Sequence, residues 1–279
     1  MYNLLKTIVI LSAFFIVKPA YGQFSTFEIY GTRANGLADI NTVFTNLDAS
    51  YGNIAGLSGM NGTQINIHYQ NRFGFTELKV LGMALGFNHK KAGAFAVTLK
   101  DFGIEEYNEF EAGIAYARKL TSTLSAGVQF NFFNLAIQGY GNTGTFSFNA
   151  GIQYGLTRNL LIGFSVKNPF PVKFTESSEL PTIIAAGMRY NVSEKVAFFS
   201  EIEKHINYEY TIKIAIQYHI VEPFTGYFGY FNSPSTYAGY SFGFSYSGLD
   251  HLNIEVSTKY NITLGLSPSI GITYKFTSR

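Results

Sequence analysis

Apolar and polar residues alternate with a period of two along most of the chain after residue 60. From Phe146 to Leu156 every even-numbered position is apolar, and every odd-numbered position is polar or glycine. The segments 210–218 and 238–246 repeat this pattern. Because successive side chains of a strand point to opposite faces, each segment is predicted to form a strand with one apolar and one polar face.

The alternation predicts fourteen strands, most of them 9–13 residues long. Strands in soluble sheets average about five or six residues, whereas a tilted strand that crosses a bilayer needs about 9–11. We therefore predict an all-β fold, a transmembrane antiparallel β-barrel of about fourteen strands. The predicted strands lie near residues 63–72, 77–88, 92–101, 109–119, 122–135, 145–156, 159–167, 182–192, 195–205, 209–219, 223–231, 236–247, 249–259 and 267–277.

The predicted connections differ in length between the two ends of the barrel. Those after even-numbered strands are short turns, and those after odd-numbered strands are longer, notably 136–144 and 168–181. Outer-membrane barrels have short periplasmic turns and longer outside loops, so the asymmetry predicts that the barrel begins and ends in the periplasm. Tyr and Phe at strand ends would form two aromatic girdles. A secreted β-sandwich is the alternative, but it would need neither such long strands nor so many outward aromatic rings.

The chain before the predicted barrel divides into two parts. Residues 1–22 have a charged start, an apolar run at 7–17 and small residues before a cut at Gly22, and so predict a cleaved signal peptide. An uncleaved anchor helix is the alternative. Residues 23–62 are rich in glycine and alternate weakly. We interpret them as a hatch-like plug inside the lumen, the place where irregular backbone is tolerated at membrane depth, with a periplasmic tail as the alternative. Residues 63–279 form the barrel.

Composition excludes several classes of protein. The 279 residues are 17% aromatic and 14% charged. A disordered chain has few aromatic residues and many charged ones, so disorder is excluded. The chain has no Cys, so it can form neither a disulfide nor a thiolate site. With Lys6 and Lys18 removed in the signal peptide, 18 basic residues face 18 acidic ones. This balance lacks the basic surplus of a nucleic-acid binder.

Most charged residues of the strands share the face that a barrel turns toward its lumen, where ionised groups avoid the cost of facing lipid. Glu201 and Glu203 lie on the strand next to Lys213, which predicts a cross-strand ion pair. The candidate lumenal residues are His68, Glu109, Glu111, Glu201, Glu203, Lys213 and Glu255.

These lumenal residues suggest three kinds of chemistry. The pairs Glu109/Glu111 and Glu201/Glu203 have the spacing of paired glycosidase carboxylates, but no sugar cleft accompanies them, so a structural network is preferred. His68 suggests a His–Ser nucleophile, but no serine signature lies near it. No histidine spacing indicates a metal site. We therefore expect a protein that is not an enzyme and has neither cofactor nor metal.

Two short stretches of the N-terminal part resemble a known family. Residues 31–38 and 53–59 resemble the opening of the PorV/PorQ-like barrels of Bacteroidetes, which belong to the wider FadL-like group of outer-membrane barrels. Ile54 stands where that family usually has proline. The residues that carry the resemblance are Gly31, Arg33, Gly36, Asn53, Ala55, Gly56 and Leu57.

The resemblance implies two functions. The first is a non-catalytic accessory or docking component, like the type IX secretion proteins, in which the extracellular loop 168–181 would bind secretion-system or other outer-membrane proteins. The second is FadL-like transport of hydrophobic small molecules, gated by the hatch, with Leu161 and Phe199 lining an apolar pocket behind it. Because the predicted lumen is polar, the sequence favours the first function. Both imply a protein integral to the bacterial outer membrane, in contact with the lipid bilayer and with no nucleic acid.

Overall fold

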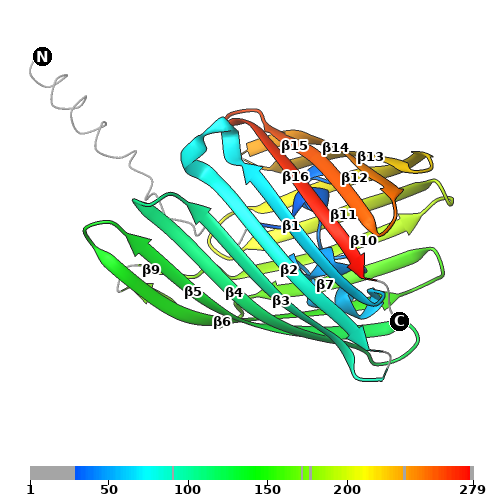
Figure 1. The fold of residues 1–279 in the computed structure, drawn as a ribbon, viewed down its shortest axis with the longest axis horizontal. Coiled ribbons are helices and arrows are strands. Elements are labelled where there is room, and N and C mark those ends of the chain that lie inside the picture. The colour runs from blue at the N-terminus through cyan, green and yellow to red at the C-terminus, as the bar shows by residue number, and fades with distance from the viewer. Residues whose placement is uncertain (1–28, 90, 171, 176–177, 235–236, 277–279) are drawn as a thin grey trace, which may run out of the picture.

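Fourteen antiparallel strands form one closed barrel in the computed structural model, as the alternation predicted (Figure 1). The structure describes residues 29–276 except 90, 171, 176–177 and 235–236. The predicted signal peptide and the first residues of the predicted hatch therefore lie outside the described residues. The barrel strands are β1 (Thr63–Asn71), β2 (Lys79–His89), β3 (Gly93–Gly103), β4 (Tyr107–Lys119), β5 (Leu124–Ile137), β6 (Gly141–Gly155), β7 (Leu160–Lys167), β10 (Ile183–Asn191), β11 (Val196–His205), β12 (Tyr210–Val221), β13 (Phe224–Ser233), β14 (Tyr237–Leu249), β15 (Leu252–Asn261) and β16 (Gly265–Phe276).

Each barrel strand pairs with its neighbours in chain order, and β1 pairs with β16 to close the cylinder. Closure leaves no open sheet edge in lipid. Inside the connection 168–181, which was predicted as a plain loop, β8 (Lys173–Thr175) and β9 (Ser178–Glu179) form a small separate sheet. These strands are too short for alternation to be recognised in the sequence. In the barrel, β10 pairs directly with β7.

The prediction of a long loop at 136–144 was wrong. Strand β5 continues to Ile137 and β6 begins at Gly141, so a tight turn joins the two strands. Gly139 and Gly141 have φ angles of 81° and 90°, and the Tyr140 N–H donates to the Ile137 carbonyl at 3.0 Å. Positive φ values favour glycine, which allows the chain to reverse within a few residues. The sequence of this hairpin tip does not alternate, which is why the pattern missed the strand ends.

The two faces of the barrel have opposite polarity. Apolar side chains point outward, and Ile214, Phe244 and Phe242 keep 52%, 54% and 48% of their surface exposed. The inward positions of the same strands carry Lys213, Ser241 and Ser245, which are buried. This arrangement suits a cylinder surrounded by hydrocarbon and excludes the alternative of a sandwich with an apolar interior. Among the residues described, no helix is long and apolar enough to cross a membrane.

Residues 29–60 lie inside the barrel, where the blue ribbon of Figure 1 is surrounded by strands. This N-terminal segment contains the short helices α2 (Thr32–Gly36), η2 (Leu47–Tyr51) and η3 (Ile54–Gly59), and nearly all of its residues are buried. Its apolar side chains, with inward-facing alanines of the strands, form the largest hydrophobic cluster of the molecule. Two further short helices, η4 (Arg72–Gly74) and η5 (Thr76–Leu78), connect β1 to β2.

Candidate functional site

The seven lumenal candidates are all buried, but they do not form one cluster. Glu111 pairs with Lys100 at 3.1 Å, and Glu109 accepts a hydrogen bond from the Tyr107 hydroxyl at 2.7 Å. The His68 ring makes an edge contact with Tyr51, with ring centroids 4.9 Å apart. Glu255 lines a separate cavity together with Asp48. The remaining three residues, Glu201, Glu203 and Lys213, lie together where β11 meets β12.

Lys213 and Glu201 anchor the N-terminal segment to the barrel wall. The Lys213 ammonium lies 2.9 Å from Glu201 and 3.0 Å from Glu203, so the cross-strand ion pair expected from neighbouring strands is present. The second oxygen of Glu201 accepts three hydrogen bonds, from the Asn41 N–H at 2.9 Å, the Thr42 N–H at 3.0 Å and the Thr42 hydroxyl at 2.8 Å. Hydrogen bonds to a charged group are stronger than those between neutral groups, so this is a firm attachment.

Two glycines of the wall make room for Thr42. Gly187 on β10 pairs with Gly163 on β7 and, on its other side, with Glu201 on β11. A side chain is excluded at both glycines, because a Cβ would lie 2.1 Å from the Thr42 carbonyl oxygen at Gly163 and 2.1 Å from the Thr42 hydroxyl at Gly187. The Thr42 carbonyl also accepts hydrogen bonds from Asn53 and Gln153, each at 2.9 Å. At this position Thr42 therefore lies directly against the backbone of β7 and β10.

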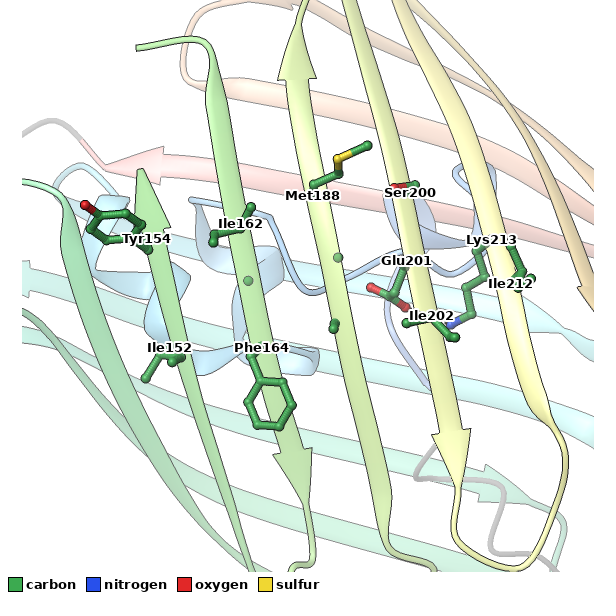
Figure 2. Close-up of a pocket in the computed structure, with 13 residues that line it drawn as sticks. Ile152, Tyr154, Ile162, Phe164, Met188, Ser200, Glu201, Ile202, Ile212 and Lys213 are labelled. Carbon is green, nitrogen blue, oxygen red and sulfur yellow. Dashed lines mark hydrogen bonds and ion pairs between the residues drawn. The ribbon is translucent and has the colours of Figure 1, made fainter. Parts of the chain in front are cut away.

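An apolar pocket of about 600 Å³ lies at the same place in the wall and is lined by side chains of β6, β7, β10, β11 and β12. Figure 2 shows Ile152, Tyr154, Ile162, Phe164 and Met188 around it, with Glu201 and Lys213 next to each other on neighbouring strands. Gly163 and Gly187 also belong to its lining. We call these lining residues, together with Thr42 behind them, the wall site.

The wall site was not predicted from the sequence. The signal that could have drawn attention to it is a glycine at an inward position of two predicted strands, at 163 and 187. Alternation gives strand ends only to within a few residues, so it could not show that the two glycines pair. Nor could it show that Thr42, more than 100 residues earlier, lies against both.

The residues that carry the family resemblance shape the N-terminal segment, because they cap its helices, allow close backbone contacts or are buried. Asn53 caps η3 by accepting from the Ala55 N–H at 3.2 Å, and its amide also donates to the Ile152 carbonyl at 2.9 Å. A Cβ at Gly56 would lie 1.9 Å from the Phe44 carbonyl oxygen. Gly31 precedes α2 with φ 89°, a conformation that favours glycine. Gly36, Ala55 and Leu57 are fully or almost fully buried, and Arg33 lies on α2.

Within the described part of the chain, no three His, Asp or Glu side chains come together in a way that could hold a metal ion. Burial raises the pKa of the Tyr51 phenol well above its ordinary value, so this group stays neutral. Phe199 is buried against the N-terminal segment and Leu161 packs at the edge of the same cluster; they do not line the apolar pocket at the wall site.

Comparison with known proteins gives a likeness of structure alone. No family model matches the sequence, and no curated protein matches it. The toluene transporter TodX of Pseudomonas putida superposes with a TM-score of 0.71 over 89% of this chain and 98% of that chain, at 12% identity. The toluene transporter TbuX of Ralstonia pickettii gives a TM-score of 0.69 over 90% of this chain and 99% of its own, at 11% identity. The chain has the fold of these two hydrocarbon transporters.

A FadL homologue of Pseudomonas aeruginosa gives a TM-score of 0.62 over 89% of this chain and 98% of its own, at 10% identity. The FadL-like part of the resemblance noted in the sequence therefore has a counterpart in the fold. The narrower resemblance to PorV/PorQ-like barrels has no counterpart among these structures and stays a prediction.

Proposed function

We propose that this protein carries hydrophobic small molecules across the bacterial outer membrane, and that they move between lumen and membrane at the wall site. The observation that carries the proposal is the apolar pocket whose inner wall is the glycine pair Gly163 and Gly187, backed by Thr42. Ligand pockets are mostly apolar hollows with a few polar groups. The shared fold with toluene transporters supports the transport function over the docking function.

Passage at this position requires the Asn41–Thr42 loop to move and the pairing of β7 with β10 at Gly163 and Gly187 to open. The loop blocks the lumenal side of the wall site through its three hydrogen bonds to Glu201. Releasing them leaves room behind the glycines, because neither glycine has a side chain to fill it. The N-terminal segment would then act as a hatch between a closed and an open state, each with its own set of contacts to the wall.

A reversible disulfide tests this proposal. The chain has no native Cys, so Thr42→Cys with Gly187→Cys offers a single possible disulfide between two positions that are in contact. We expect oxidation to lock the loop against the wall and to lower uptake of radiolabelled naphthalene by at least about tenfold in cells whose outer membrane lacks other hydrocarbon channels. Reduction should restore uptake.

The reduced double variant is the matched control, because it carries both side-chain changes without the cross-link. Thr42→Cys alone, treated with the same oxidant, controls for the oxidant. Gly187→Cys alone is not used, because its side chain would clash with the Thr42 hydroxyl. Equal uptake by the oxidised and reduced double variant, with the disulfide verified by mass spectrometry, would contradict passage at the wall site. Uptake equal to that of cells without the protein, in the reduced variant and in the wild type alike, would contradict transport of this class of molecule.

A docking function is the second candidate and rests on the connection between β7 and β10. Phe170 keeps 68% of its surface exposed there, and an exposed aromatic ring is a common anchor in protein interfaces. Purification of the tagged barrel from its native membrane tests this function. A stoichiometric partner that is lost on Phe170→Ala would favour docking, and recovery of the barrel alone would contradict it.

A further inference from the structure

Another cavity opens at the end of the barrel that carries the short turns. It has a volume of about 540 Å³ and lies between α2 and the strands β10, β11 and β12. Its lining differs from that of the wall site, because polar side chains predominate. They include Arg33, Arg189, Asn191, Ser193, Gln217 and His219.

Arg189 differs from three of the lysines that face the lumen. Lys100, Lys213 and Lys259 each contact a carboxylate. In contrast, the neighbours of Arg189 in the sheet register are Leu161 on β7 and Phe199 on β11. Its Nε is buried and, among the residues described, has no hydrogen-bond acceptor.

A second guanidinium reaches the same cavity from α2. Arg33 donates from Nη2 to the Gln217 amide oxygen at 2.7 Å, and Asp48 lies 4.0 Å from its Nη1. The Nε of Arg33 is also buried, with no acceptor in the described part of the chain. The carboxylate in the lining is Glu194, which is exposed on the turn after β10 next to the exposed Lys195. The inner part of the cavity thus holds two cations and the neutral donors around them.

We propose that this cavity binds a phosphate group, free or as a phosphate monoester, between Arg33 and Arg189. A guanidinium presents its N–H groups in a planar fork that matches the oxygens of phosphate. Arg189 from β10 and Arg33 from α2, whose charge Asp48 partly offsets, both offer N–H donors, and the Asn191 amide and Ser193 hydroxyl supply further donors at the lining. This site is separate from the wall site and does not depend on the transport proposal.

Calorimetric titration of the purified full chain in detergent micelles with inorganic phosphate tests the proposal. We expect saturable binding that weakens by about tenfold or more in Arg189→Gln, because a hydrogen-bonded charge pair is lost. Arg189→Lys keeps the charge without the fork and should lie between the two. Arg158→Gln removes the same charge at an exposed position on the turn before β7 and should change the affinity by less than about twofold.

Further titrations separate the sources of the phosphate group. Glycerol 3-phosphate binding as tightly as inorganic phosphate supports a monoester, and binding of inorganic phosphate alone supports the free ion. Heat-modifiability on gels verifies that each variant is folded. The proposal is overturned if the wild type shows no saturable phosphate binding, if folded Arg189→Gln binds like the wild type, or if malonate binds more tightly than both phosphates.

Discussion

The N-terminal segment is attached to two sides of the barrel by different chemistry. From Thr32 to Ala38 its contacts with β14, β15 and β16 are neutral hydrogen bonds: Thr32 contacts Ser269 at 2.8 Å, the Asn35 amide donates to Ser257 at 2.9 Å and the Ala38 N–H donates to Ser241 at 2.8 Å. We call these hydrogen bonds the serine contact. The next residue, Asp39, forms an ion pair with Lys259 on β15. Toward β11 and β12 the segment is held by Glu201, itself paired with Lys213, which we call the charged contact.

The two contacts differ in how much stability is lost when one interacting residue is removed. A neutral hydrogen bond contributes about 0.5–1.5 kcal/mol net, so the serine contact can lose one member and remain in place. A buried ion that loses its partner keeps its desolvation cost, which makes the charged contact sensitive to a single change. The charged contact also lies at the wall site. Control over the proposed passage is therefore concentrated in Glu201, Lys213 and the Asn41–Thr42 loop.

The largest effect is expected when the cation of the charged contact is removed. Lys213→Met keeps the length of the side chain but leaves Glu201 and Glu203 buried without the ammonium. We expect the free energy of unfolding to fall by about 3–5 kcal/mol, measured by urea titration in lipid vesicles with far-UV circular dichroism. Lys195→Met, on an exposed turn, is the control. A fall no larger than in that control would show that the charged contact contributes little.

A smaller effect is expected when the carboxylate of the charged contact is neutralised. Glu201→Gln retains an oxygen acceptor for Asn41 and Thr42 but loses the charge, and hydrogen bonds to charged groups are worth about 1.5–3 kcal/mol against about 0.5–1.5 for neutral ones. Hydrogen exchange of a peptide covering residues 39–45 should become about tenfold faster. Exchange at Asn35 and Ala38, in the serine contact, should not change. Equal acceleration at both contacts would mean that the segment moves as one body.

The smallest effect is expected within the serine contact. Ser269→Ala removes the partner of the Thr32 hydroxyl and should lower the free energy of unfolding by about 1 kcal/mol in the same urea titration. Uptake of naphthalene should stay within about twofold of wild type. A loss of uptake as large as that of the locked disulfide would place the moving part of the segment at α2 instead of at the Asn41–Thr42 loop.

The sequence predicted the barrel more fully than the site. The outward orientation of Phe242, Phe244 and their alternating neighbours can be predicted from the sequence, because the side that a residue faces depends on its position within one strand. The charged residues at 201, 203 and 213 were placed in the lumen on the same ground. The hairpin tip at 138–140 was missed because its residues do not alternate.

The sequence by itself determined which side chains face hydrocarbon and how the chain crosses it, since alternation and strand length are local properties. Only the tertiary structure decided that Thr42 lies between Gly163, Gly187 and Glu201, and that Arg189 stands between Leu161 and Phe199. Those contacts depend on the pairing register of several strands and on the course of an irregular segment through the lumen. Neither leaves a periodic trace in the sequence, because each is set by packing between residues far apart in the chain.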